Sequence, residues 1–399
     1  MKILIVTPYL GYNYGGPAKS VIELVLETGN QGVFVDVVTT NANSYENLSV
    51  LLNKWIYKKS YRIRYFSCWN KNDLIISPSL NIWLFNHVIQ YDLVHTNTIF
   101  APLISLAHWA CQFHQVPYII TPRGMLEPWA LSYKAHKKKL YYNLFEKSAL
   151  QQASAIQVLA SSEAEQVKSL GFQNSIIVPN GIHQKQFETL PEPELFYQNF
   201  PATRHKNLIL FLGRIDPKKG LDLLAPAFAK VHSKFPQTHL IVAGPDSIDF
   251  IPTVKNYFKQ AGCLNAVTFT GMLTGSIKQA ALAAASLYVA PSYSEGFSMS
   301  VLEAMASGLP CVITTGCNFP EAAAAFSAHV VDIDADAIAN ALIECLKNPQ
   351  EAQLMGMKAR QFIFQNYTWE QAAKKLLKTY REIINKKSIQ NIELEHNII

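Results

Sequence analysis

Short runs of apolar, mostly β-branched residues alternate with longer helical patterns along almost the whole sequence. The runs are apolar nearly throughout, instead of alternating between apolar and polar residues, so we expect both faces of each strand to be buried. Strands of this kind, separated by helices, are typical of parallel sheets that helices cover on both sides. The runs form two series, which are 3–6, 33–39, 93–95, 118–121, 155–158 and 175–178, and then 208–212, 239–243, 267–270, 287–290, 311–314 and 329–331.

The two series predict an α/β fold with two doubly wound, Rossmann-like domains. Each series opens with a strand, a loop that contains glycine and a helix, first at Gly15-Gly16 and later at Gly213 and Gly220. Residues 184–207 contain three prolines and little apolar periodicity, which indicates a linker. Ligands of such sheets bind beyond the carboxyl ends of the strands, so two facing domains would share a cleft. The expected parts are a domain at 1–190, a linker at 191–206, a second domain at 207–366, a helix at 367–385 that packs back on the first domain, and a tail at 386–399.

Composition and charge exclude several classes of protein. A net charge of +6 over 399 residues is too weak and too dispersed to indicate a nucleic-acid partner. The six cysteines lack metal-ligand spacing and are expected to be reduced thiols of a cytoplasmic protein. The first apolar run is too short for a signal peptide, and the interrupted stretch 98–113 is too short to span a bilayer. We therefore expect a cytoplasmic protein with no membrane-spanning segment and no metal site.

Residues 290–310 contain two glutamates in a distinctive setting. A strand-like run ends in a polar loop that carries Glu295, and a short helix that carries Glu303 follows. Free N–H groups at the start of a helix favour anions, so this combination predicts a pocket for a negatively charged, hydroxyl-rich ligand. Glu303 has an alternative role, because Ser300 and Glu303 match the spacing of a capping box. Glu295 has no comparable structural role.

Two further loops could contact the same kind of ligand. The loop 213–220 carries Arg214, Lys218 and Lys219, and a diphosphate requires such distributed positive charge. The alternative is a solvated loop whose lysines point to water. Gly15-Gly16 would let a phosphate or an acceptor approach the backbone closely, or it forms only a tight turn. It is not a GxGxxG motif, which removes the main support for a dinucleotide oxidoreductase.

These motifs resemble those of the retaining nucleotide-sugar glycosyltransferases of the GT-B fold, family 4. The most specific part is Glu295-x7-Glu303 within Pro-Ser-x-x-Glu-Gly-Phe…Leu-Glu-Ala-Met-Ala-x-Gly-x-Pro. The resemblance covers nearly the whole chain. The other matching segments, in the order that the family shows, are Asp92-Leu-Val-His95, Val178-Pro-Asn180-Gly181, Gly213-Arg214…Lys219-Gly220, Val242-Ala-Gly244, Phe269-Thr-Gly271 and Tyr367-Thr-Trp369.

The resemblance implies roles for individual residues. Arg214 and Lys219 would hold the donor diphosphate and stabilise it as the leaving group, with no obligatory metal or other cofactor. Glu295 would bind donor sugar hydroxyls near the reacting carbon, and Glu303 would accept hydrogen bonds from the ribose. The C-terminal domain would bind the nucleotide sugar, and the N-terminal domain the acceptor. The remaining donor-binding candidates are Gly296, Phe297, Ser298 and Met299 at the sugar and phosphates, Gly271 and Leu273 at the nucleobase, and Gly15 and Gly16 of the N-terminal domain.

The chain departs from the family pattern at a few positions. Arg123 stands where many members carry a histidine, and a permanently charged guanidinium cannot shuttle a proton. A general-base role therefore does not carry over, although Arg123 can still hold a phosphate or the donor sugar. His183 stands where aspartate commonly follows Pro-Asn-Gly, and Ser298 replaces a frequent glycine. The candidates for acceptor or phosphate binding are Arg123, Asn180 and His95, and His95 could equally be a core histidine.

The expected function is the retaining transfer of a hexose-type unit from a UDP- or GDP-sugar to a hydroxyl of a glycan or lipid-linked sugar. Surface polysaccharide or lipopolysaccharide biosynthesis is the expected context. A nucleotide-sugar epimerase of the same fold and a catalytically silent glycan-binding module are the alternatives. The joint presence of Arg214, Lys219, Glu295 and Glu303 argues against the silent module.

Two other charged segments allow more than one interpretation. Asp332-Ile-Asp334-Ala-Asp336 contains Asp-x-Asp, which binds a metal in another transferase fold, but it precedes a helical pattern and is better explained as a helix cap. The segment 129–147 combines lysines with apolar residues, and such a helix could lie on the anionic inner face of the plasma membrane. The alternative is a solvated basic face over packed aromatics. The residues concerned are Lys134, Lys137, Lys138 and Lys139, beside Tyr133, Leu140, Tyr141, Leu144 and Phe145.

Overall fold

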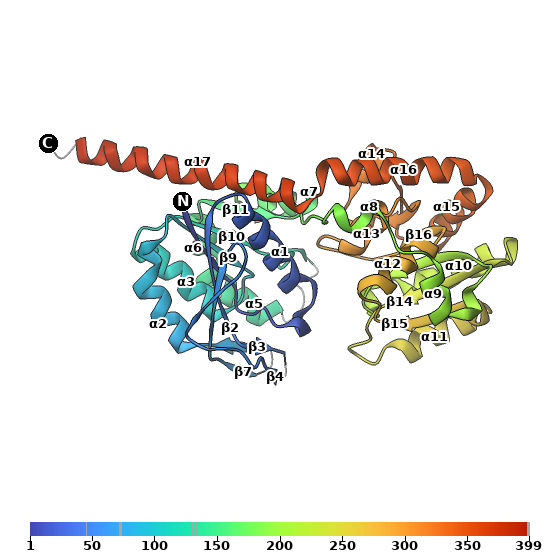
Figure 1. Ribbon diagram of the computed structural model, residues 1–399. Helices are drawn as coiled ribbons and strands as arrows, with labels where there is room; N and C mark the ends of the chain where they lie inside the picture. The colour runs from blue at the N-terminus through green and yellow to red at the C-terminus, as the bar shows by residue number, and fades with distance from the viewer. Residues whose placement is uncertain (45, 72–73, 129–130, 132–134, 397–399) are drawn as a thin grey trace. The chain divides into compact units, whose positions relative to one another are not determined.

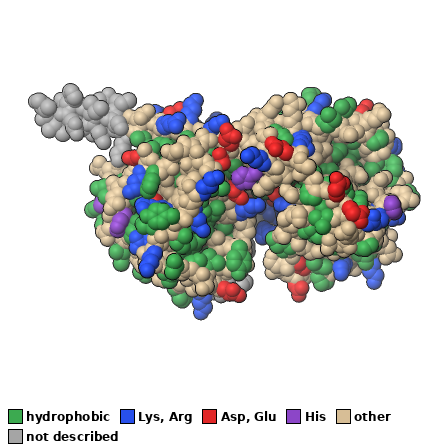
Figure 2. Space-filling model, viewed as in Figure 1, with side chains coloured by type: hydrophobic (Ala, Val, Ile, Leu, Met, Phe, Trp, Pro, Cys, Tyr) green, Lys and Arg blue, Asp and Glu red, His purple; other side chains and the backbone are tan. Residues whose placement is uncertain are grey.

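The structure is a computed structural model that describes residues 1–44, 46–71, 74–128, 131 and 135–396 (Figure 1). It forms two compact units, of which the first comprises Met1–Asn180 with Trp369–Ile399 and the second comprises Gly181–Thr368. Each unit is built on a largely or wholly parallel sheet with helices around it, as the apolar runs predict. Basic and acidic side chains are both scattered over the face shown in Figure 2.

The first unit contains an eight-stranded sheet in the order β12-β11-β10-β9-β1-β2-β6-β5. All neighbouring strands are parallel except β5, which runs antiparallel to β6. The six strands expected from the sequence are present, whereas β5 and β6 were not expected. The bounds are β1 Lys2–Val6, β2 Phe34–Thr40, β5 Trp55–Tyr57, β6 Arg62–Phe66, β9 Leu93–Asn97, β10 Tyr118–Thr121, β11 Ala155–Val158 and β12 Ser175–Ile177, and the short hairpins pair β3 Ala42–Asn43 with β4 Glu46–Asn47 and β7 Trp69–Lys71 with β8 Leu74–Ile76.

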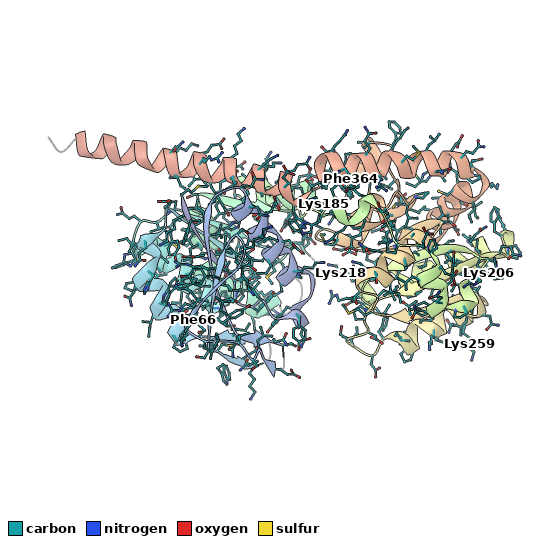
Figure 3. The ribbon with its side chains drawn as sticks, in the orientation of Figure 1. Phe66, Lys185, Lys206, Lys218, Lys259 and Phe364 are labelled. Atoms are coloured by element: carbon teal, nitrogen blue, oxygen red, sulfur yellow. The ribbon has the colours of Figure 1, made fainter. Side chains whose placement is uncertain are left out.

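Strand β6 was missed because two arginines interrupt its apolar pattern. Arg62 donates to the fully buried Asp36 of β2 at 2.5 and 2.8 Å, so its charge is neutralised by a residue far away in sequence. The Arg64 guanidinium lies over the rings of Phe66 and Trp83. Phe66, labelled in Figure 3, is buried in the core of this unit. A partly buried guanidinium can therefore stand on a strand of this sheet when a carboxylate or aromatic faces accompany it.

The C-terminal helix α17 (Trp369–His396) belongs to the first unit and packs against α1 (Gly16–Asn30). Its Tyr380 is fully buried and bonds to His95 of β9. None of the described helices is both long enough and apolar enough to span a membrane. Among the described residues, the other α-helices of this unit are α2 Pro78–His87, α3 Pro102–Phe113, α5 Ala135–Tyr141, α6 Lys147–Gln152 and α7 Ser161–Ser169, and a π-helical turn spans Tyr142–Glu146.

The second unit contains a wholly parallel six-stranded sheet in the order β15-β14-β13-β16-β17-β18. All six strands were expected from the sequence. They are β13 Asn207–Leu212, β14 Thr238–Ala243, β15 Val267–Gly271, β16 Leu287–Ala290, β17 Cys311–Thr314 and β18 His329–Val331. The helices are α8 Lys185–Glu188, α9 Glu194–Asn199, α10 Leu221–Lys234, α11 Ile251–Gln260, α12 Gly275–Ala284, α13 Met299–Ala306, α14 Pro320–Ala324, α15 Ala335–Lys347 and α16 Pro349–Asn366.

The linker expected at 191–206 is instead an ordered part of the second unit. Pro193 lies at the start of α9, and Pro201 begins a 3-10 turn, positions where the fixed φ of proline is favourable. Phe196 is fully buried in the core, where it packs against Phe200 with ring centroids 4.9 Å apart. The prolines therefore mark starts of turns rather than an extended connection, and the chain passes between the units at 180–181 and again at 368–369.

Candidate functional site

The site of the second unit is set by the order of its strands. From β13 the chain continues outward through β14 to β15, then returns to β16 on the other side of β13 and continues to β18. Ligands of doubly wound sheets bind at this reversal, beyond the carboxyl ends of the two central strands. The loop after β13 carries Arg214 and Lys219, and the loop after β16 carries Glu295. The two sequence motifs therefore meet at one edge of the sheet.

A glycine brings the two loops together. Gly220 has a left-handed backbone with φ of 69°, which most residues avoid. A Cβ at this position would lie 1.9 Å from the carbonyl oxygen of Pro291, so only glycine allows the loops to approach so closely. Next to it, the Tyr293 N–H donates to the carbonyl oxygen of Lys218 at 2.9 Å. Backbone contact thus fixes the position of Lys219 relative to the loop that carries Glu295.

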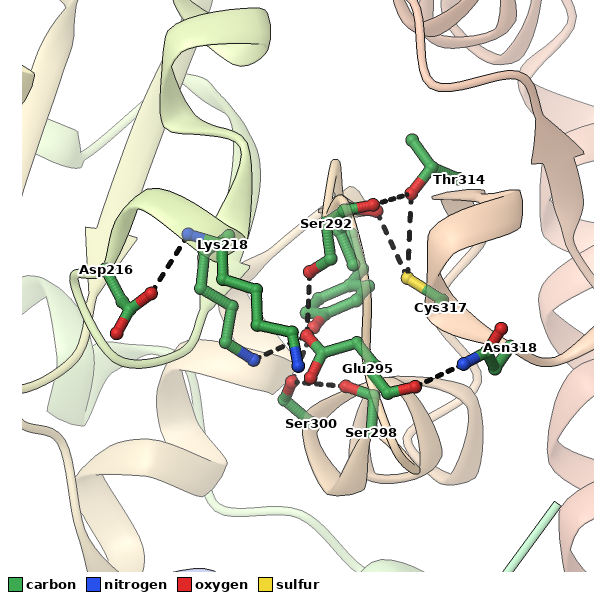
Figure 4. Close-up of polar contacts among 12 residues, drawn as sticks. Asp216, Lys218, Ser292, Glu295, Ser298, Ser300, Thr314, Cys317 and Asn318 are labelled. Atoms are coloured by element: carbon green, nitrogen blue, oxygen red, sulfur yellow. Dashed lines mark hydrogen bonds and ion pairs between the residues drawn. The ribbon is translucent and has the colours of Figure 1, made fainter. Parts of the chain in front are cut away.

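Lys219 and Glu295 form a partly buried ion pair. The Lys219 Nζ lies 2.5 Å from the Glu295 Oε1, and the two side chains are 15% and 12% exposed. The Ser292 hydroxyl donates to the same oxygen at 2.7 Å (Figure 4). The backbone of Glu295 is held on both sides, because its N–H donates to the Gly316 carbonyl at 2.7 Å and its carbonyl accepts from Asn318. Arg214, on the same loop as Lys219, is exposed.

Glu303 does not cap its own helix, so the capping-box interpretation is wrong. The helix α13 begins at Met299 with Ser298 as its N-cap residue, and no side chain caps it. Glu303 instead accepts a hydrogen bond from the Lys278 Nζ of α12 at 2.7 Å. Lys278 was not identified from the sequence, because it lies 25 positions away on another helix.

The remaining candidates of the second unit lie at residues 296–299, around the start of α13, and at Gly271 and Leu273, at and just after the end of β15. Phe297 uses its ring for packing, since it stacks on Tyr367 with centroids 6.1 Å apart, and Ser298 is 9% exposed beside it. Gly296 and Met299 are half-buried at the start of α13. Leu273 is buried in the core, so its side chain would not face a nucleobase. Gly271 ends β15 with a left-handed backbone.

The other candidates lie in the first unit, at or near the carboxyl edge of its sheet. Gly15 has φ of 68° and precedes α1, and Cβ atoms at Gly15 and Gly16 would meet nothing within 4 Å. A side chain at either position would therefore meet open space, and the Gly15 N–H already donates to the Tyr12 carbonyl oxygen at 3.1 Å. Asn180 is 8% exposed and is the last residue before the chain enters the second unit.

Arg123 is held by three hydrogen bonds. It follows β10 with an unusual φ of 55°, and its guanidinium donates to Asn97 at 3.0 and 2.7 Å and to Ser20 at 2.8 Å. Burial lowers the pKa of Arg123 to about 10, so it stays protonated at neutral pH. The adjacent Gly124 N–H donates at 2.7 Å to the fully buried Glu163, which also accepts from the Leu159 N–H. No local pattern singles out Glu163, yet it anchors the loop that presents Arg123.

His95 lies in the core of the first unit rather than at its surface. It is 2% exposed and bonds to the hydroxyls of Tyr380 and Thr121, each at 2.6 Å. Burial, with the nearby charge of Arg123, lowers the pKa of His95 to about 3, so the imidazole is neutral. It joins α17 to the sheet, as the core interpretation predicts.

The acidic segment before α15 has a structural role. The Asp334 carboxylate accepts from the N–H groups of Asp336 and Ala337, each at 2.9 Å, and therefore caps the helix. Asp336 pairs with Lys230. Within the part of the chain that the structure describes, no three His, Cys, Asp or Glu side chains gather as a metal site would require.

Comparison with known proteins links this geometry to a family. The model described as "Glycosyl transferases group 1" matches residues 196–362, and the model described as "Glycosyltransferase Family 4" matches residues 14–186. Together they cover most of both units.

Individual relatives are more distant. The chain is 28% identical over 223 residues to phosphatidyl-myo-inositol mannosyltransferase of Mycolicibacterium smegmatis, a match that covers 55% of this chain and 54% of that protein. The chain thus spans about half the length of that relative. It is 24% identical over 337 residues to alpha-monoglucosyldiacylglycerol synthase of Streptococcus pneumoniae, which covers 78% of this chain and 70% of that protein.

Solved structures share the whole fold. Sucrose-phosphate synthase of Thermosynechococcus elongatus matches with a TM-score of 0.75 and 21% identity, over 97% of this chain and all of that one. Anabaena HepE, solved with UDP and glucose, matches with a TM-score of 0.74 and 17% identity, over 96% of this chain and all of that one. With two family models matched and this fold shared, the chain belongs to the GT-B glycosyltransferases of the family 4 type.

Proposed function

We propose that the protein transfers a sugar, with retention, from a UDP- or GDP-sugar to a hydroxyl of a glycan or lipid-linked sugar. The observation that supports this most is the Lys219–Glu295 pair, which forms where two loops meet at the strand reversal and whose lysine shares its loop with the exposed Arg214. The reaction requires cationic groups near the diphosphate, where negative charge develops, and an anionic group near the sugar ring, where positive charge develops. Both kinds of group are present where these loops meet.

The proposed chemistry assigns one charge to each side of the breaking bond. When the anomeric C–O bond breaks, negative charge builds on the departing diphosphate and positive charge on the sugar ring. Lys219 and Arg214 would stabilise the diphosphate without a metal, and Glu295 would stabilise the ring. Lys219 bonds to Glu295 in the structure, and in this proposal it turns to the diphosphate when the donor binds. Each such contact is worth about 3 kcal/mol, which is on the order of a hundredfold in rate.

The class of acceptor is supported by the relatives. One is named for mannosyl transfer to phosphatidyl-myo-inositol and another for the synthesis of a glucosyldiacylglycerol. An acceptor on a lipid or a growing glycan, in surface polysaccharide or lipopolysaccharide biosynthesis, fits these names. In this proposal Arg123 binds a phosphate or the sugar, because its guanidinium cannot accept the acceptor proton.

The reaction is tested by incubating the protein with UDP-, GDP- and ADP-sugars and candidate acceptors. Transfer with release of nucleotide supports the proposal, whereas epimerised donor or binding without turnover indicates one of the alternatives. We expect Glu295→Gln and Arg214→Ala each to lower transfer by about a hundredfold or more with the fold retained. Glu351→Gln, on the exposed surface of α16, is the matched control. Near-normal turnover in Glu295→Gln would overturn the assignment of the site.

We also propose that the segment 135–147 contacts the anionic inner face of the plasma membrane. Leu140, Leu144 and Phe145 are 63%, 61% and 50% exposed, and exposed lysines accompany them. Such a mixed surface suits an interface between lipid headgroups and acyl chains. Tyr133 and Lys134, expected to contribute, lie outside the described residues.

Vesicle binding tests this contact. Changing the lysines of this segment to glutamine should weaken binding to vesicles that contain anionic phospholipid, and neutral vesicles should bind poorly throughout. Binding that is unchanged by the substitution would contradict the proposal. The test set is Lys137, Lys138 and Lys139, and the control set is Lys255, Lys259 and Lys347 of the second unit.

A further inference from the structure

The ion pair between Lys278 and Glu303 has no role in the transfer chemistry described above. The Lys278 Nζ lies 2.7 Å from the Glu303 Oε1, and the side chains are 24% and 16% exposed. The pair joins two different helices, α12 and α13. Since Glu303 caps no helix, Lys278 is the partner that determines where its carboxylate points.

Lys278 also lies close in the chain to the loop expected at the nucleobase. The helix α12 has Thr274 as its N-cap residue, directly after the loop 271–274. The N–H of Lys278 donates to the carbonyl oxygen of Thr274 at 3.3 Å, so Lys278 is in the first turns of this helix. It therefore connects the segment expected at the base with the carboxylate expected at the ribose.

The chemistry of the pair suits recognition of a diol. Lys278 occupies one carboxylate oxygen of Glu303, and the other remains to accept from the two adjacent hydroxyls of a ribose. A glutamate side chain without a partner samples several rotamers, and ordering it on binding costs free energy. A charged hydrogen bond at this distance selects one orientation before the ligand arrives.

We infer that Lys278 is a positioning residue for donor binding, which holds the Glu303 carboxylate in the orientation that accepts hydrogen bonds from the ribose. This inference rests on the proposed function, because it takes the donor to be a nucleoside diphosphate sugar. In this inference Lys278 contributes to nucleoside affinity, although it lies outside both the glycine loops and the Glu295–Glu303 segment.

Calorimetric titration with UDP, GDP and their 2′,3′-dideoxy analogues tests the inference. We expect Lys278→Met to lower the affinity for the nucleotide that the wild type prefers by about tenfold, which corresponds to about 1.4 kcal/mol of binding free energy. Its affinity for the dideoxy analogue should be unchanged, because that analogue lacks the hydroxyls concerned. Lys278→Arg should restore most of the affinity, and in turnover Lys278→Met should raise KM much more than it lowers kcat.

The control is Lys230→Met, which removes an ion pair to Asp336 from the exposed surface of the same unit and should change neither affinity. Glu303→Gln is a second variant, and it should show the same selective loss for the nucleotide with hydroxyls. The inference would be overturned if Lys278→Met bound the nucleotide and its dideoxy analogue with equally reduced affinity. It would also be overturned if Lys278→Met bound the nucleotide as tightly as the wild type or more tightly. A wild type that binds neither UDP nor GDP would refute the proposed donor class itself, which is a separate outcome.

Discussion

Replacing Gly220 by alanine would separate the two loops that bring Lys219 and Glu295 together. The new Cβ would lie 1.9 Å from the Pro291 carbonyl oxygen, so the loops must move apart by about 1 Å to reach even the closest contact of 3.0 Å. Holding alanine at φ of 69° costs about 1–2 kcal/mol, and overpacking adds about 1–3 kcal/mol. A displacement of this size at reacting groups can lower turnover by about a hundredfold.

Gly262→Ala is the matched control. Gly262 has nearly the same backbone, with φ of 75°, but a Cβ there would meet nothing within 4 Å. The free energy of unfolding of Gly262→Ala should therefore fall only by the conformational cost of about 1–2 kcal/mol, and its turnover should be unchanged. Urea unfolding gives the free energies of unfolding, and transfer from the donor that the wild type accepts gives the rates. Equal stability and equal turnover of the two variants would refute the reasoning that the approach of Gly220 to Pro291 assembles the site.

Two further predictions concern the stability of each unit. Burial lowers the pKa of His95 and His108 to about 3, so the unfolded chain binds protons first and stability is lost as pH falls below about 6.5. Burial raises the pKa of Glu146 to about 7, so its contribution is present at low pH and is lost as pH rises towards 7. Between pH 6.5 and pH 5 the two histidines lower the free energy of unfolding by about 3 kcal/mol, and Glu146 raises it by about half of this. Glu146→Gln should therefore make the free energy of unfolding, measured by urea titration, fall more steeply with decreasing pH. An unchanged slope would contradict these assignments. Phe196→Ala should cost about 3–5 kcal/mol in the unfolding of the second unit, because the side chain is fully buried, whereas a change near zero would mean that this segment is only a linker.

The strands that the sequence predicts are those whose pattern is local. Runs such as Leu208–Leu212 are apolar at every position, and burial on both faces of a parallel sheet produces that pattern without reference to other segments. Strand β6 was missed because Arg62 is neutralised by Asp36, which lies 26 positions away. The linker prediction failed for a related reason, since Pro193 begins a short helix whose Phe196 is buried only by residues elsewhere in the unit.

The two glutamates illustrate the same limit at the site. The local spacing from Ser300 to Glu303 fits a capping box, but the helix starts earlier and the carboxylate bonds to Lys278 of another helix. No local pattern distinguishes these outcomes, because the competing partners are one turn away in one case and 25 positions away in the other.

The sequence by itself determined the fold class, the strands of both series and the two charged loops that follow β13 and β16, because backbone burial and loop chemistry are encoded in neighbouring residues. The tertiary structure alone decided which charges meet. Lys219 reaches Glu295 across 76 positions only because Gly220 lets its loop touch Pro291. Ion pairs between distant segments depend on how closely two loops or helices approach, and that distance is set by packing of the whole unit rather than by any periodicity along the chain.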